Sequence, residues 1–260
     1  MGKPLVYYEL EGNIARVLLD HPPLDALDMP TRLALEEVFI ELEERCHQIR
    51  AVVLAGAGER AFAAGADIAA FLELTPETAR QRLRRTHAIF RRVEDFPRPV
   101  IAAIHGYCLG GGLELALCCD VRYASEDAVL GFPEVGLSVF PGNGGTARGL
   151  RLLTLGRFKE LVFSGRRISA RQAYEYGLVE QVVPSGQVME AALELARTIA
   201  RQGPLGVAAA KQVINRNCDL ALEAALEVES EAWARLMDSH DAKEGARAFL
   251  EKRKPVWQGR

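Results

Sequence analysis

The chain has 260 residues, and its 32 lysines and arginines nearly balance its 35 aspartates and glutamates, giving a formal net charge of −3 at pH 7. This balance excludes a strong overall attraction to nucleic acid or to an anionic membrane surface. With 49% hydrophobic and 26% charged residues, the composition is that of a globular protein that buries a large core.

The N-terminal segment lacks the basic and then apolar pattern of a signal peptide, and no apolar run approaches the ~18 residues of a membrane span. The five cysteines are an odd number with no Cys-x-x-Cys pair, which favours a reducing compartment over a disulfide framework. The adjacent Cys118 and Cys119 have no histidine ligand pattern nearby, so we expect small buried side chains rather than a metal site. These features predict a cytoplasmic protein without a membrane anchor.

Hydrophobic periodicity predicts that strands and helices alternate through the first 183 residues. In chain order we expect a β-hairpin over 5–11 and 14–19, a helix over 31–48, a strand over 51–55, a helix over 76–94, a strand over 100–104, a helix from 110 to 117, strands over 121–124 and 128–130, and a last strand over 179–183. This alternation is typical of an α/β organisation with covered strands.

The pattern changes near residues 195–205, where Gly203-Pro204 interrupts the chain. Segments rich in alanine, leucine and glutamate predict helices over 185–202, 205–216, 219–237 and 241–253. The sequence therefore predicts an α/β body followed by a helical C-terminal part.

Two glutamates stand in separate glycine-rich segments, Glu114 within 106–120 and Glu134 within 131–137, and a third such segment covers 60–68. Paired carboxyls beside exposed backbone amides suit acid–base chemistry at a carbonyl compound, because one group moves a proton, one holds water, and the amides stabilise charge on oxygen. Taken singly, each feature could equally be structural: glycines where a helix meets a strand, or a glutamate that faces solvent.

The order and spacing of the three segments resemble those of the enoyl-CoA hydratase/isomerase (crotonase) superfamily. The resemblance extends from the hairpin to 241–255 and includes Phe-Pro-Gly-Asn-Gly-Gly-Thr-Ala-Arg over 140–148. It implies an α/β fold, a crotonase-like spiral of ββα units that carries the active site over residues 1–200. It also implies a helical C-terminal trimerisation region over 201–260, with trimers that commonly pair into hexamers.

The resemblance assigns roles to individual residues. In this family two backbone N–H groups bind the thioester oxygen, and the matching positions are Ala66 and Gly111. Glycine lets the backbone approach a ligand closely, and a helix N-terminus offers free N–H groups with partial positive charge. The hydratases carry two glutamates that match Glu114 and Glu134, which would hold one water between them. Glu114 would orient this water and accept its proton as it attacks C3, and Glu134 would deliver a proton to C2.

The implied activity is that of an enoyl-CoA hydratase, a hydro-lyase that converts short or medium 2-trans-enoyl-CoA into (3S)-3-hydroxyacyl-CoA in fatty-acid β-oxidation or related acyl-CoA degradation. No metal or redox cofactor is implied, because CoA arrives attached to the substrate. Isomerases of the family usually keep only the second glutamate, so a Δ3,Δ2-enoyl-CoA isomerase is an alternative. A specialised hydratase of aromatic or branched-chain catabolism is another. An acyl-CoA- or RNA-binding member with little turnover is the alternative of a different class.

Further contacts to the substrate and its CoA are expected at Ala64, Asp67, Ile68, Gly110, Trp233 and Lys252. The last two could reach CoA from a neighbouring subunit, or could equally be ordinary surface or core residues. Asp67 is better suited to capping the next helix than to moving protons. Two departures from the family, Ala69 in place of a common lysine and Ala147 in place of a common glutamine, leave CoA affinity and acyl preference open.

The predicted helix over 76–94 carries an unusual number of arginines, namely Arg80, Arg82, Arg84, Arg85, Arg91 and Arg92. We expect a solvated face. A role near the CoA phosphates and an RNA-binding strip are the alternatives, and the acidic balance of the whole chain argues against RNA.

Overall fold

The computed structural model describes residues 3–65 and 68–260. Its strands are β1 (Val6–Glu11), β2 (Ile14–Leu19), β3 (Ala51–Gly56), β4 (Ala61–Ala63), β5 (Val100–Ile104), β6 (Tyr107–Leu109), β7 (Val121–Ser125), β8 (Val129–Gly131), β9 (Arg167–Ser169) and β10 (Gln181–Val183). They form a six-stranded sheet in the order β1-β2-β3-β5-β7-β10 and a four-stranded sheet in the order β4-β6-β8-β9.

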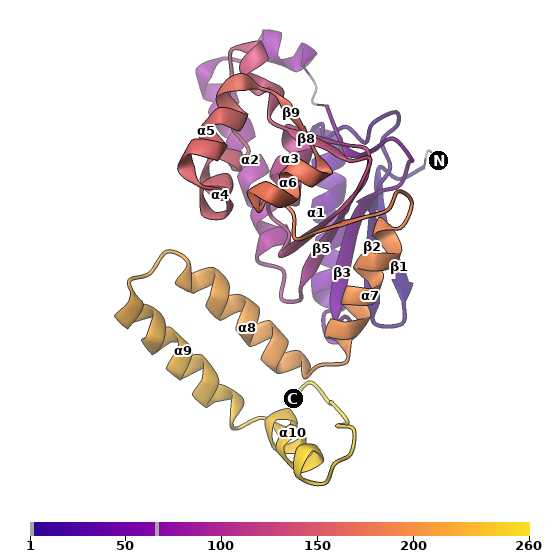
Figure 1. Ribbon diagram of the computed structural model, residues 1–260, viewed down its shortest axis with the longest axis vertical. Coiled ribbons are helices and arrows are strands. Elements are labelled where there is room, and N and C mark those ends of the chain that lie inside the picture. The colour runs from indigo at the N-terminus through magenta and orange to yellow at the C-terminus, as the bar shows by residue number, and fades with distance from the viewer. Residues whose placement is uncertain (1–2, 66–67) are drawn as a thin grey trace.

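Helices surround and extend these sheets (Figure 1). They are α1 (Met29–Glu44), α2 (Pro76–Glu94), α3 (Gly111–Ala116), α4 (Gly145–Leu152), α5 (Leu155–Ser164), α6 (Ala170–Tyr176), α7 (Val188–Ala200), α8 (Pro204–Asn217), α9 (Leu222–Leu236) and α10 (His240–Leu250). Two short 3-10 helices, η1 (Ala69–Glu73) and η2 (Pro133–Leu137), complete the element order.

A repeated strand–strand–helix unit builds the body. β3 and β4 lead to α2, β5 and β6 lead to α3, and β7 and β8 lead to η2. The first strand of each pair joins the six-stranded sheet and the second joins the four-stranded sheet, with parallel pairing of β3 to β5, β5 to β7 and β6 to β8. The predicted spiral of ββα units is confirmed.

The core lies on both faces of the six-stranded sheet. Every residue of β3 and β5 is buried, which explains why both read as unbroken apolar runs. One face packs against α7, and the other packs against α1, α2 and the four-stranded sheet. The glycine-rich segments follow strands of this core, so a rigid framework positions them.

The predicted hairpin and the helix over 76–94 match β1–β2 and α2 closely. Thr75 and Thr78 form a capping box and Pro76 occupies the first turn, which accounts for the clear start of α2. The strands β4, β6 and β9 were not predicted. Each has only three residues, too few to show an alternation.

The arginines of α2 are largely paired. Arg85 pairs with Glu36, Arg92 with Glu43 and Arg91 with Asp95, and Arg80 pairs with Glu77 one turn earlier. These pairs to acidic neighbours fit the expected solvated face.

The C-terminal helices α8 and α9 form a hairpin that projects from the body, and α10 follows at its base (Figure 1). Lys211 fastens α8 to the sheet, because its Nζ donates to Asp120 Oδ2 at 2.8 Å and to the carbonyl oxygen of Arg98 at 3.1 Å. Within residues 3–65 and 68–260, no helix is long and apolar enough to cross a membrane.

Gly112 permits the close contact between α3 and β4. A methyl group at this position would lie 1.9 Å from the carbonyl oxygen of Ala63, a backbone atom that cannot easily move. We expect Gly112→Ala to lower the free energy of unfolding by at least about 2 kcal/mol through overpacking, as measured by chemical denaturation.

Gly156 in α5 is the matched control, because a methyl group there would meet nothing within 4 Å. Gly156→Ala should leave stability unchanged or slightly higher. Equal stability of the two variants would contradict the proposed packing of α3 on β4.

Candidate active site

Glu114 lies in the first turn of α3, directly after the strand β6. Gly110 precedes this helix with φ 53° and ψ −122°, a conformation that side chains rarely adopt. This turn of the backbone directs the chain into α3 and places the side chain of Glu114 in the interior, where it is 0% exposed.

The carboxylate of Glu114 accepts three hydrogen bonds from the loop and helix that follow η2. Oε1 accepts from the backbone N–H of Asn143 at 2.7 Å and from that of Gly145 at 2.9 Å, and Oε2 accepts from Asn143 Nδ2 at 2.6 Å. Gly145 is the first residue of α4, so the carboxylate caps the positive end of that helix. Burial raises the pKa of Glu114, and these hydrogen bonds oppose the rise by stabilising the charged form.

Glu134 has a different environment on η2. Its Oε2 is buried and has no hydrogen-bond partner among the described residues. Burial is the main cause that raises the pKa of Glu134 to about 7, and the negative charge of Glu114 adds to the rise. A proton is therefore held on Glu134 well above the pH at which a solvated glutamate loses it.

Both carboxyls lie close to the N-terminus of α3. Glu114 belongs to the first turn of this helix. A methyl group on Gly110, the residue before the helix, would be 3.0 Å from Glu134 Oε1. The first residues of α3 have backbone N–H groups without an intrahelical acceptor, and the N-cap residue Gly110 has no side chain to cap them. Two carboxyls with different surroundings and a set of backbone N–H groups therefore lie at one helix end.

The structure adds Arg32 and Asn143, which were not predicted. Arg32 is 3% exposed, and its Nη1 donates to Thr86 Oγ1 at 2.7 Å. A methyl group on Gly111 would lie 3.8 Å from both Arg32 Nη2 and Asn143 Nδ2. The sequence gives one sign that Arg32 is buried. This charged residue stands three residues before Leu35, at a position on the apolar face of α1.

Four other predicted residues come from the segment around η1. Ala66 and Asp67 lie outside the described residues. Ala64 is buried, and Ile68 is partly exposed at the start of η1. Their predicted contacts to substrate stay predictions.

Trp233 on α9 is 63% exposed, and Lys252 follows α10 on the surface. Figure 1 shows α9 and α10 well apart from α3 within the chain. The structure therefore does not bring these two side chains to the glutamates of the same chain.

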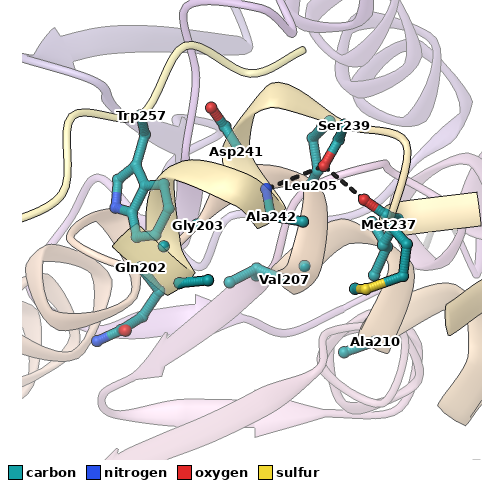
Figure 2. A pocket seen from close by; sticks show the side chains of 14 residues that line it. Gln202, Gly203, Leu205, Val207, Ala210, Met237, Ser239, Asp241, Ala242 and Trp257 are labelled. Atoms are coloured by element: carbon teal, nitrogen blue, oxygen red, sulfur yellow. Dashed lines mark hydrogen bonds between the residues drawn. The ribbon is translucent and has the colours of Figure 1, made fainter. Parts of the chain in front are cut away.

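An apolar pocket of about 460 Å³ lies between α8, the end of α9 and α10 (Figure 2). Trp257 forms one wall, and Ser239 caps α10 by accepting from the backbone N–H of Ala242 at 3.0 Å. Neither glutamate lines this pocket, and it lacks a convergent acid and base. The candidate active site is therefore the N-terminus of α3, where the two glutamates lie.

Comparison with known proteins shows the family of the chain. The family model described as Enoyl-CoA hydratase/isomerase matches residues 9–260. The chain is 41% identical to a short-chain-enoyl-CoA hydratase of Clostridium acetobutylicum over 96% of its length and 95% of that protein. It is 35% identical to a crotonyl-CoA hydratase of Syntrophomonas wolfei, covering 96% of each. A crystal structure of an enoyl-CoA hydratase from Bacillus anthracis superposes with a TM-score of 0.93 at 39% identity, covering 98% of this chain and 100% of that one.

The raised pKa of Glu134 can be measured without turnover. Infrared difference spectra should show a protonated carboxyl that titrates near pH 7, and Glu134→Gln should abolish that band. Glu114→Gln should move the midpoint to lower pH, because it removes a negative charge that opposes ionisation of Glu134.

The control is Glu160→Gln, which alters a side chain that is 54% exposed and should leave the band unchanged. A wild-type protein with no carboxyl titrating between about pH 6 and pH 8 would contradict the assignment.

Proposed function

The chain belongs to the enoyl-CoA hydratase/isomerase family, and from its paired carboxyls we propose that it is an enoyl-CoA hydratase. It adds water across the double bond of a short or medium 2-trans-enoyl-CoA to give (3S)-3-hydroxyacyl-CoA. The observation that carries this proposal is the pair itself: Glu114 fixed by three N–H donors, and Glu134 holding a proton near neutral pH, at one helix end.

In the proposed reaction the thioester oxygen binds to the backbone N–H groups of Gly111 and Ala66. Glu114 takes a proton from a water molecule while the water oxygen bonds to C3. The electron pair of the double bond moves toward the thioester, where the two amides stabilise the developing charge. Glu134 then gives its proton to C2. The water supplies both added groups, and the two carboxyls must exchange a proton before the next turnover.

The isomerase alternative needs one base that moves a proton between C2 and C4. Glu114 is the carboxyl that isomerases of the family usually lack. In this structure it is completely buried and accepts three hydrogen bonds. A protein that only binds acyl-CoA requires neither carboxyl. Both observations favour hydration.

The reaction as proposed needs no cofactor beyond the CoA carried by the substrate. We place the protein in the cytoplasm, because its five cysteines are free thiols, as expected in a reducing compartment. The pathway that it serves is acyl-CoA degradation of the β-oxidation type.

The direct test is the loss of enoyl-thioester absorbance when crotonyl-CoA is mixed with the protein. A panel of enoyl-CoA substrates from four to sixteen carbons then defines the chain-length preference. Conversion of a 3-enoyl-CoA into the 2-enoyl isomer without hydration would favour the isomerase instead.

Replacement of either glutamate should impair the chemical step. Glu114→Gln and Glu134→Gln should each lower kcat by at least about 10²-fold with little change in KM, since each removes one proton-transfer group. The double variant should lose far less than the product of the two single losses, because the carboxyls act on one water as a unit.

Steady-state kinetics with crotonyl-CoA measure these effects, and circular dichroism checks the fold. Full activity in either single variant would refute the two-carboxyl mechanism. A harmless Glu114→Gln alone would point to the isomerase.

We further propose that the protein assembles as a trimer or a pair of trimers through its C-terminal helices. These helices leave large apolar side chains on the surface, including Leu222, Leu226, Trp233 and Phe249. Exposed apolar patches of this kind usually mark an interface. Assembly would also allow Trp233 and Lys252 to approach the CoA of a neighbouring subunit.

Leu226→Glu combined with Trp233→Glu should therefore dissociate the assembly, because charges would replace apolar contacts. Light scattering should give three or six times the subunit mass for the wild type and one subunit mass for the variant. The control is Leu10→Glu on β1, which alters an apolar side chain of similar exposure on the body. A wild-type protein that is monomeric at micromolar concentration would refute this proposal.

A further inference from the structure

Arg32 is a buried cation with incomplete pairing. Its Nη1 hydrogen bonds to Thr86, which is itself fully buried, while its Nε is buried without a partner among the described residues. No carboxylate of the described part of the chain forms an ion pair with it, although buried arginines usually have one. A structural link between α1 and α2 would not by itself require a charge here.

The free end of this guanidinium faces the active site. Nη2 and Asn143 Nδ2 are both 3.8 Å from the position that a methyl group on Gly111 would take. Asn143 Nδ2 in turn donates to Glu114 Oε2 at 2.6 Å. Arg32 therefore lies beside Gly111, the proposed oxygen-binding residue, as does the Asn143 amide that binds the Glu114 carboxylate.

The other charged groups around Glu114 leave Arg32 as its main source of positive charge. From α4, Arg148 is already bound to Glu94, with Nη2 and Oε2 at 2.6 Å. From the end of α3, Cys118 is neutral at pH 7, because burial raises the pKa of its thiol well above the ordinary value.

Further charged groups act on the two side chains. From η2, Glu134 contributes negative charge when it is ionised. Arg82 on α2 repels the charge of Arg32, while the carboxylates of Asp28 and Glu114 attract it. Burial lowers the pKa of Arg32 to about 10, so it still carries its charge at pH 7.

We propose that Arg32 is a positioning residue of the reaction, whose buried guanidinium balances the charge of the Glu114 carboxylate beside the N-terminus of α3. This inference rests on the proposed hydratase function. Glu114 must be ionised to accept a proton from water, and full burial opposes its ionisation. Three hydrogen bonds and the end of α4 supply part of the compensation, and the guanidinium of Arg32 adds positive charge near the carboxylate.

The test is the pH profile of kcat for crotonyl-CoA in variants that separate charge from packing. Activity falls as pH drops through the pKa of Glu114, because the base becomes protonated. Loss of the cation raises that pKa, so Arg32→Met should move the acidic limb upward by about one pH unit and lower kcat by up to about tenfold at pH values on that limb. KM should change little.

Two variants keep the charge and should keep the profile. Arg32→Lys should restore the acidic limb to within about 0.3 pH unit of the wild type, and Thr86→Val should do the same although it removes the hydrogen bond to Arg32. Arg85→Met, which removes an arginine of α2 bound to Glu36 at the surface, is the matched control. If Arg32→Met does not fold, Arg32→Gln removes the charge and retains an amide for Thr86.

An unchanged acidic limb in the folded, charge-removing variant would overturn the inference, and an equal shift in Arg32→Met and Thr86→Val would assign Arg32 a packing role only. If the wild type does not hydrate crotonyl-CoA, the proposed function fails separately. The infrared titration of Glu114, measured in a Glu134→Gln background with the double Glu114→Gln variant subtracted, then still tests Arg32. Its midpoint should rise by about one pH unit in Arg32→Met, and an unchanged midpoint would overturn the inference.

Discussion

The carboxylate of Glu114, held by the start of α4, is the interaction on which the site depends. It joins α3 to the start of α4, because Glu114 belongs to α3 while its donors are Asn143, just before α4, and Gly145, the first residue of α4. A buried carboxylate is unfavourable unless hydrogen bonds and positive charge replace its water. The surrounding backbone is shaped to provide them, and a methyl group on Gly145 would already press against Oε1 at 2.9 Å.

The two carboxyls differ because their surroundings differ. Glu114 receives three hydrogen bonds and the field of a helix end, whereas Glu134 leaves one buried oxygen without a partner in the described residues. Burial raises the pKa of Glu114 but its hydrogen bonds oppose the rise, whereas burial and the negative charge of Glu114 raise the pKa of Glu134 to about 7. Two chemically identical side chains can therefore serve as base and acid at the same pH. Because each charge affects the other, their titrations belong to the pair.

Long elements and long motifs were predictable from the sequence. The amphipathic helix α2, with its proline and capping threonine, and the apolar strands β3 and β5 carry strong local signals. The glutamates were found because each stands in a glycine-rich segment with a recognisable order. The crotonase-like spiral followed from the resemblance, and the second sheet did not follow from periodicity, since β4, β6 and β9 have three residues each.

The contacts around the glutamates could not be predicted in the same way. Asn143 reaches Glu114 across a separation of 29 residues, and Arg32 meets Thr86 across 54. Such contacts depend on how α1, α2 and α4 pack, which no local pattern records. The one sign of these contacts in the sequence was Arg32, a charged residue among the apolar positions of α1.

The most direct test of this account is isotopic analysis of the product made from crotonyl-CoA. In water enriched in ¹⁸O, hydration by the paired carboxyls places one solvent oxygen on C3, and in deuterated water it places one solvent hydrogen on C2. Mass spectrometry of 3-hydroxybutyryl-CoA should show both labels, with the thioester intact. A product with a migrated double bond and no solvent oxygen, or release of free CoA, would contradict the central claim.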